Sequence, residues 1–180
     1  PDIVCLAKAL GGGLPCGAIG GTEEVMSAIT DGVYDQIGTF NGNPLTMAAA
    51  RATLTEVLTP EVYTRAEALG ERMLAGSVAA LAAHGQPSYG KVHGFKGSVV
   101  FHDRPARNYR EFLAISTAVS HLHFLVQFNG GVFLPPWGKS ESWTLSVAHG
   151  DDDGDRYIAN VARLAEMVAG VGDRASDLFA

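Results

Sequence analysis

The chain has 180 residues and a net charge of −6, and 47% of its residues are hydrophobic. That hydrophobic share is typical of a globular chain and excludes a disordered one. The acidic balance, without a basic cluster, argues against nucleic acid as a partner, and no apolar run approaches the ~20 residues that cross a bilayer.

A lysine between an apolar run and a glycine run is the first candidate catalytic feature. Residues 3–6 predict a strand, Lys8 follows two residues later, and residues 11–13 are all glycine. The neighbours of Lys8 are apolar, and no adjacent carboxylate holds its ammonium in water. Burial in such surroundings lowers the pKa of an amine and makes it a nucleophile towards carbonyl carbon. A strand end followed by a glycine turn with an incidental lysine fits the same letters.

The segment LAKALGGGLPCGAIGG at residues 6–21 resembles the lysine segment of the class III, fold type I aminotransferases that use pyridoxal phosphate. Within that family it is most similar to the glutamate-1-semialdehyde aminomutase branch. The resemblance implies pyridoxal 5′-phosphate as the cofactor, held through a Schiff base on Lys8. It also implies an α/β fold: a large mixed α/β domain of fold type I followed by an α+β small domain.

The family resemblance also implies that the chain is the C-terminal portion of a longer enzyme. The lysine of the family lies past the middle of its members, and their upstream half supplies the ring-stacking residue and the aspartate that faces the pyridine nitrogen. We expect residues 1–58 to belong to the large cofactor-binding domain and residues 59–180 to form the small one. We expect the isolated chain to bind the cofactor weakly or not at all, and to be inactive.

Between residues 17 and 58 the sequence predicts a strand at 17–21, a helix after Thr22 that ends at Asp31, and a longer helix up to residue 58. The predicted long helix follows the motif GTFNGNP, in which Asn43 is a good N-cap and the next residue, a proline, suits the first helical position. A helix N-terminus near a hydroxyl is an anion site, although an ordinary capped helix fits the pattern equally well. In the class III family this loop supplies a threonine that reaches the cofactor phosphate of the partner subunit. Thr39 is at the matching position, and the resemblance therefore implies a homodimer.

The sequence from residue 59 onward predicts a hinge at 59–60, a helix at 61–83, a strand at 97–101 and a helix at 109–128. His121 and His123 lie two positions apart on the last of these helices, so they point about 200° apart and cannot share a metal ion. We interpret them as structural. Three arginines near residue 107 form either a solvated rim or a carboxylate site.

The last part of the chain predicts strands at 132–134 and 143–147 and a helix from Asp151 to about residue 168. The aspartates at 151–153 are interpreted as helix-capping residues, and no metal site is expected. The ending again resembles the aminomutase branch, in which a glutamate before the last strand faces the active site. Glu141 is the nearest match and a candidate substrate residue; an exposed loop carboxylate is the other interpretation.

Together these features predict amino-group transfer by an aminotransferase or aminomutase that acts on a small amino acid, keto acid or amino-aldehyde. A racemase or decarboxylase on the same scaffold is one alternative, and a catalytically incomplete fragment with a structural or dimerisation role is another. Cys5 and Cys16 match no zinc or disulfide pattern, and no secretory leader is seen. A reduced, cytoplasmic protein without a membrane or nucleic-acid partner is therefore expected.

Overall fold

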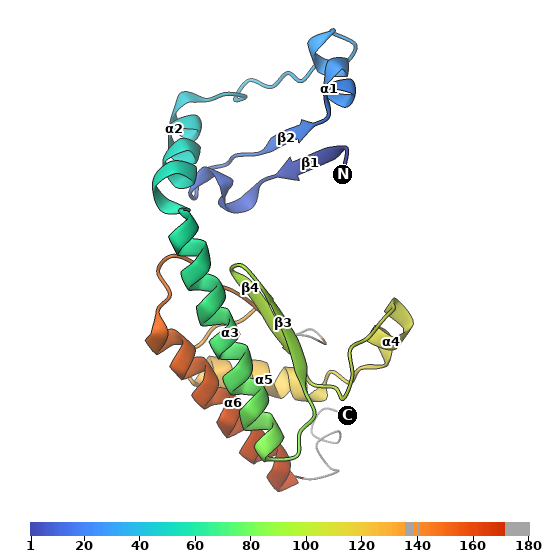
Figure 1. The fold of residues 1–180 in the computed structure, drawn as a ribbon, viewed down its shortest axis with the longest axis vertical. Coiled ribbons are helices and arrows are strands. Elements are labelled where there is room, and N and C mark those ends of the chain that lie inside the picture. The colour runs from blue at the N-terminus through green and yellow to red at the C-terminus, as the bar shows by residue number, and fades with distance from the viewer. Residues whose placement is uncertain (136–138, 140, 172–180) are drawn as a thin grey trace. The chain divides into compact units, whose positions relative to one another are not determined.

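A computed structural model of the chain describes residues 1–135, 139 and 141–171, with the side chains of residues 141, 142 and 171 excepted. The chain divides into two compact units, Pro1–Pro60 and Glu61–Ala180. The path of the chain through both is drawn in Figure 1. Within the described residues, no helix combines the length and the apolar character that crossing a membrane needs.

Unit 1, residues 1–60, begins with a two-stranded antiparallel hairpin. Strand β1 (Ile3–Leu6) pairs with β2 (Ala18–Gly21), and a short 3-10 helix, η1 (Lys8–Gly11), lies between them. Helix α1 (Glu23–Thr30) follows, and the Thr22 side chain caps it by accepting from the Val25 amide. Both predicted strands and this predicted helix are confirmed, because local propensity and capping chemistry already specify them.

The predicted helix up to residue 58 forms, but its last turns are not α-helical. Helix α2 (Pro44–Ala52) passes into a π-helical segment, η2 (Thr53–Val57). The Leu58 amide donates to the Thr53 carbonyl at 2.9 Å, an i to i+5 bond that the sequence pattern does not reveal.

Unit 2, residues 61–180, packs helices against a three-stranded antiparallel sheet in the order β3-β4-β5 (Figure 1). Its elements are α3 (Pro60–Ala83), β3 (Tyr89–His93), β4 (Lys96–Val100), α4 (Tyr109–Ala114), α5 (Ala118–Asn129), β5 (Glu141–Thr144) and α6 (Asp151–Val171). The core combines α3, the sheet and α6, with Leu81, Val99, Tyr157 and Val161 almost fully buried. Together with unit 1, this is the mixed α/β content that the sequence predicts.

Glycines let α3 and α6 approach each other closely. A Cβ built at Gly76 would lie 2.8 Å from a methyl carbon of Ile158, and one at Gly154 would lie 2.7 Å from a methyl carbon of Leu69. Real Cβ contacts are longer than this, so a larger residue at either position would require the facing Ile158 or Leu69 side chain to move.

Three predictions for unit 2 need correction. The helix predicted at 109–128 is interrupted at Ile115, which is extended (ψ 131°), and the Ser116 hydroxyl accepts from the Ala118 amide to begin the second helix. The strand predicted at 132–134 does not form, because the Val132 amide bonds to the Gln127 carbonyl instead of to a neighbouring strand. Strand β3 is not predicted from the sequence, because Gly90 obscures the alternation of its side chains. Strand β5 (Glu141–Thr144) begins two residues before the strand predicted at 143–147 and ends three residues before it.

Candidate functional site

The turn that contains Lys8 has an unusual backbone. Lys8 has φ +56°, and among the described residues it is the only non-glycine with a positive φ. The left-handed conformation costs an ordinary residue about 1–2 kcal/mol, and such strain clusters at functional sites. Gly12 and Gly13 follow with φ +58° and +100°, conformations that glycine adopts without strain.

The surroundings of Lys8 differ from those expected from its sequence neighbours. Lys8 is exposed, and so is every residue of β1 and β2. In unit 1 these strands pair only with each other, so the apolar residues beside Lys8 have no second layer to pack against. The burial expected for the Lys8 amine is therefore not found in unit 1. The Lys8 ammonium forms no ion pair with any described residue.

The loop that contains Thr39 ends in a tightly capped helix. The Asn43 side-chain oxygen accepts from the amides of Leu45 and Thr46 at 3.0 and 3.3 Å. The predicted cap is confirmed, but it occupies the donors that a phosphate at the α2 N-terminus would use. The Thr39 hydroxyl is exposed and makes no hydrogen bond with the described residues, so it remains available to a ligand.

A cavity of about 540 Å³ in unit 1 lies between residues 15–19 and residues 36–47. Its wall combines Pro15, Cys16, Gly17 and Ile19 with Gln36, Phe40, Asn41, Gly42, Thr46 and Met47. Lys8 and Thr39 do not line it, although Thr39 directly precedes the wall residue Phe40 in the chain. No charged side chain lines this cavity, so a ligand phosphate there would rely on hydrogen bonds.

The segment around Thr39 exposes an unusual amount of apolar surface. Five of its side chains are 61–84% exposed: Val33, Tyr34, Ile37, Phe40 and Leu45. Large exposed apolar patches typically mark interaction sites.

Glu141, the candidate substrate residue, lies in strand β5, where its backbone pairs with Val99. Its side chain is outside the described residues, so its predicted role is not tested. Within residues 1–135, 139 and 141–171, no group of three or more histidine, cysteine, aspartate or glutamate side chains is placed to hold a metal ion.

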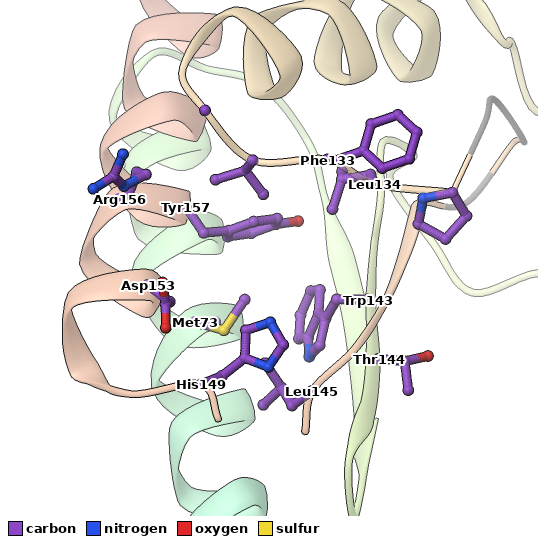
Figure 2. A pocket seen from close by; sticks show the side chains of 13 residues that line it. Met73, Phe133, Leu134, Trp143, Thr144, Leu145, His149, Asp153, Arg156 and Tyr157 are labelled. Atoms are coloured by element: carbon purple, nitrogen blue, oxygen red, sulfur yellow. The ribbon is translucent and has the colours of Figure 1, made fainter. Parts of the chain in front are cut away.

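Unit 2 contains a second cavity, of about 590 Å³, that the sequence did not indicate (Figure 2). Met73, Trp143 and Tyr157 form much of its wall, with His149 and Asp153 at one side. These polar groups are engaged locally, since His149 Nδ1 accepts from the Ser146 amide and an Asp153 oxygen accepts from the Gly150 amide, both at 2.9 Å. They therefore do not converge on the cavity as a catalytic set.

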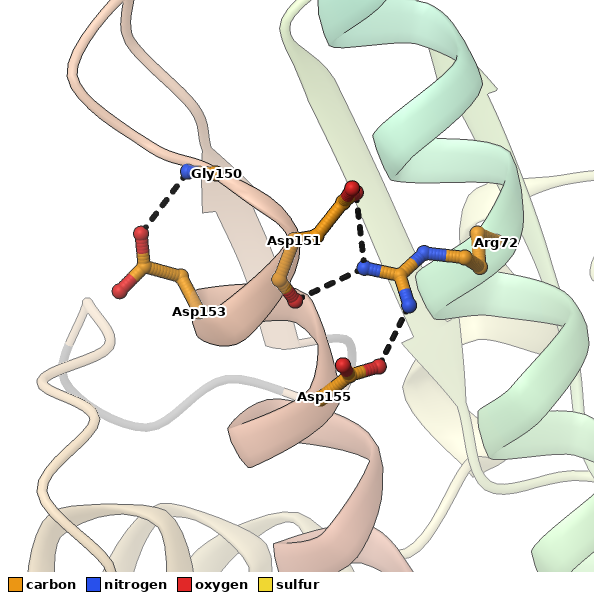
Figure 3. Close-up of polar contacts among 5 residues, drawn as sticks. All are labelled: Arg72, Gly150, Asp151, Asp153 and Asp155. Atoms are coloured by element: carbon orange, nitrogen blue, oxygen red, sulfur yellow. Dashed lines mark hydrogen bonds and ion pairs between the residues drawn. The ribbon is translucent and has the colours of Figure 1, made fainter.

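Helix α6 is anchored by an arginine of α3 (Figure 3). One terminal nitrogen of Arg72 donates to the carbonyl and the carboxylate of Asp151, at 2.8 and 3.1 Å, and the other donates to the Asp155 carboxylate. The aspartates of this turn thus serve the helix N-terminus and its arginine, in agreement with their interpretation as capping residues.

His123 is fully buried beside Gln127, and it is Gln127 that bonds α5 to α6. Gln127 Nε2 donates to the Tyr157 carbonyl at 3.1 Å and lies 3.1 Å from His123 Nε2, while Gln127 Oε1 accepts from Asn160 Nδ2 at 3.0 Å. Because the Gln127 amide nitrogen is a donor, His123 Nε2 accepts and the ring proton is on Nδ1. Burial lowers the pKa of His123 to about 3. This burial agrees with the interpretation of His123 as structural.

Comparison with known proteins gives consistent results along the chain. A sequence profile described as "Aminotransferase class-III" matches residues 1–121. The chain is 38% identical over 162 residues to glutamate-1-semialdehyde 2,1-aminomutase 2 of Exiguobacterium sibiricum, and 40% identical over 160 residues to glutamate-1-semialdehyde 2,1-aminomutase 1 of Bacillus cereus. These alignments cover 89% and 88% of this chain but only 37% of each relative.

Solved structures agree on the fold. An omega-transaminase from Sphaerobacter thermophilus is similar with a TM-score of 0.78 at 27% identity, covering 92% of this chain and 38% of that one. A glutamate-1-semialdehyde-aminomutase from Pseudomonas aeruginosa PAO1 gives 0.79 at 24% identity, covering 92% and 39%. The chain thus has the fold of part of a fold type I enzyme, and it spans well under half the length of the proteins it matches.

Proposed function

The chain belongs to the class-III aminotransferase family, and on that premise we propose that it is part of an enzyme that transfers amino groups with pyridoxal 5′-phosphate. One observation carries the proposal. Among the described residues, Lys8 is the only non-glycine with a positive φ; it lies inside the matched region and has no ion-pair partner among those residues. A nucleophilic amine in a fixed, strained turn is the group that this chemistry requires.

The residues of unit 1 fit this cofactor by their chemistry. Lys8 offers a primary amine for covalent attachment, and Thr39 offers a hydroxyl without a hydrogen-bond partner among the described residues for a phosphate oxygen. When bound, pyridoxal phosphate supplies an aldehyde for the substrate amine and a ring that accepts electrons from the reacting carbon. Lys8 would hold the cofactor through its amine and, when that amine is free, would carry a proton at the reacting carbon.

We further propose that the protein is a homodimer in which Thr39 serves the partner's cofactor phosphate. The exposed apolar side chains on both sides of Thr39 support this, because a second copy covering them would remove them from water. In the same scheme, residues 1–58 belong to the large domain and residues 59–180 form the small domain, with Glu141 facing the substrate. A cytoplasmic location is proposed on the sequence grounds given above.

The similarity to two aminomutases over most of this chain favours rearrangement of glutamate-1-semialdehyde within this family. In an aminomutase both half-reactions use one carbon skeleton, so no separate amino acceptor is needed. A racemase or decarboxylase would use the same lysine, and an incomplete enzyme would use none.

Incubation of the full-length protein with glutamate-1-semialdehyde, and separately with amino-acid and keto-acid pairs, tests the proposal. We expect amino-group migration or transfer, and a loss of about 10²–10⁴-fold in rate in Lys8→Ala, since that change removes a proton-transferring group. Chiral analysis of the recovered amino acid detects racemisation, and CO₂ release detects decarboxylation. Either product without amino transfer would refute the proposed reaction.

A further inference from the structure

A contact within unit 1 joins the end of the Lys8 turn to the junction of α2 and η2. A Cβ built at Gly12 would lie 2.4 Å from Thr53 Oγ1 and 3.8 Å from the Ala49 carbonyl oxygen. The backbone of Gly12 therefore lies directly against the Thr53 hydroxyl, in a space that no side chain could share. With φ +58° as well, Gly12 is fixed both by its conformation and by this contact.

The Thr53 hydroxyl is itself held in place. It donates to the Ala49 carbonyl at 2.9 Å, one helical turn earlier, and the residue is half-buried. Thr53 is also the first residue of the π-helical segment, whose Leu58 amide bonds to its carbonyl. Single π-helical turns inside helices are frequent at functional sites.

The contact is transmitted to Lys8 through two hydrogen bonds. The Gly12 amide donates to the Ala9 carbonyl at 3.0 Å, and the Leu10 amide donates to the Ala7 carbonyl at 3.2 Å. The bond from Leu10 spans Lys8, and the bond from Gly12 closes the turn directly after it, so a displacement of Gly12 would be passed to the backbone around Lys8. A strained residue keeps its conformation only when its surroundings hold it there.

We propose that Thr53 is a positioning residue for Lys8. Its hydroxyl, oriented by the Ala49 carbonyl, supports Gly12 and thereby keeps the Lys8 turn in the left-handed conformation. The effect of Thr53 on catalysis rests on the proposed function of Lys8, whereas its support of the turn does not depend on that function.

Unit 1 offers a matched control at Thr55. Its hydroxyl makes the same type of bond, to the Arg51 carbonyl at 2.9 Å, but Thr55 is exposed and is not among the groups nearest to Gly12. Thr53→Val and Thr55→Val each replace one such hydroxyl with a methyl group of similar shape. Only Thr53→Val places the new methyl group against Gly12. A third variant, Thr53→Ser, keeps a hydroxyl at this position.

The first readout is amide hydrogen exchange in the full-length protein, without cofactor, resolved for the peptide that contains the Lys8 turn. We expect Thr53→Val to raise exchange at the Leu10 and Gly12 amides at least tenfold. Thr55→Val and Thr53→Ser should stay within about twofold of the wild type. Equal effects of the two valine variants, or no effect of either, would overturn the proposal.

The second readout is the rate at which the cofactor-free protein, given pyridoxal phosphate, gains a borohydride-stable label on Lys8. Thr53→Val should slow it several-fold, and Thr55→Val should not; equal rates in these two variants count against a role of Thr53 in positioning Lys8. If the wild type takes no label at Lys8, the proposed function fails, while the exchange experiment still decides whether Thr53 holds the turn.

Discussion

Single residues show where function and stability compete in this chain. Lys8 keeps a backbone conformation that its side chain disfavours, in a turn built from glycines that adopt it freely. The sequence indicates the lysine and the glycines, because their order is specific. It does not indicate that Lys8 shares the glycines' left-handed conformation, since that depends on the contact between Gly12 and Thr53, about forty residues later in the chain.

This strain predicts that the stability of the protein depends on how well the residue at position 8 tolerates the left-handed conformation. Asparagine tolerates the left-handed conformation better than other non-glycine residues. We expect Lys8→Asn to raise the free energy of unfolding by roughly 0.5–1 kcal/mol relative to Lys8→Ala. Urea unfolding of both variants measures the difference. If the two have the same stability, the backbone of Lys8 is not strained.

His123 illustrates a second limit of the sequence. Its helical position indicates a structural role. Its complete burial and the position of its ring proton depend on Gln127 and on contacts with α6, whose residues Tyr157 and Asn160 come more than thirty positions later in the chain. The unfolded chain binds a proton on this ring below pH 6.5, whereas the folded chain does so only below about 3. Stability from this group is therefore complete above pH 6.5 and is lost as the pH falls towards 3.

We predict that His123 lowers the free energy of unfolding by about 1.4 kcal/mol for each pH unit as the pH falls from 6.5 to the folded-state pKa of about 3. Urea unfolding across this range measures it, compared with His123→Gln, in which the contribution disappears. His84→Gln, which replaces an exposed histidine at the end of α3, is the control and should keep the wild-type pH dependence. The same slope in His123→Gln as in the wild type would contradict the prediction.

At the scale of elements, local sequence specifies most helices, and tertiary contacts decide the remainder. Thr22 and Asn43 cap α1 and α2 as predicted, because capping is local chemistry. The interruption at Ile115 was not predictable from periodicity, since the apolar spacing continues through it into α5. Ile115 is 2% exposed, so tertiary burial of that side chain outweighs helix continuity there.

Strand pairing in unit 2 gives a sharp test of packing. Gly97 of β4 lies opposite Trp143 of β5, and a Cβ at Gly97 would be 2.3 Å from the indole ring. We expect Gly97→Ala to destabilise the protein by about 1–3 kcal/mol, because the buried ring must move. Thermal or urea unfolding measures this, with Ser98→Ala in the same strand as the control. A loss no larger than that of the control would show that the ring moves freely.

At the scale of the whole molecule, the family is evident from the sequence while the complete site is not. The order of lysine, glycines and the GTFNGNP loop identifies the class III family, which the profile match over residues 1–121 confirms. The burial of Lys8 could not be judged from its neighbours in sequence, because β1 and β2 have no other sheet partner in unit 1. The proposed role of Glu141 and the proposed dimer depend on contacts that unit 1 and the described part of unit 2 do not contain.

Borohydride reduction of the full-length protein with pyridoxal phosphate, followed by peptide mass analysis, tests the central assignment most directly. Reduction turns a reversible link between an amine and an aldehyde into a stable one, so the mass increase marks the lysine that holds the cofactor. We predict a phosphopyridoxyl mass on the peptide that contains Lys8, absent in Lys8→Ala. A label on another lysine, or an unlabelled Lys8 peptide, would contradict it.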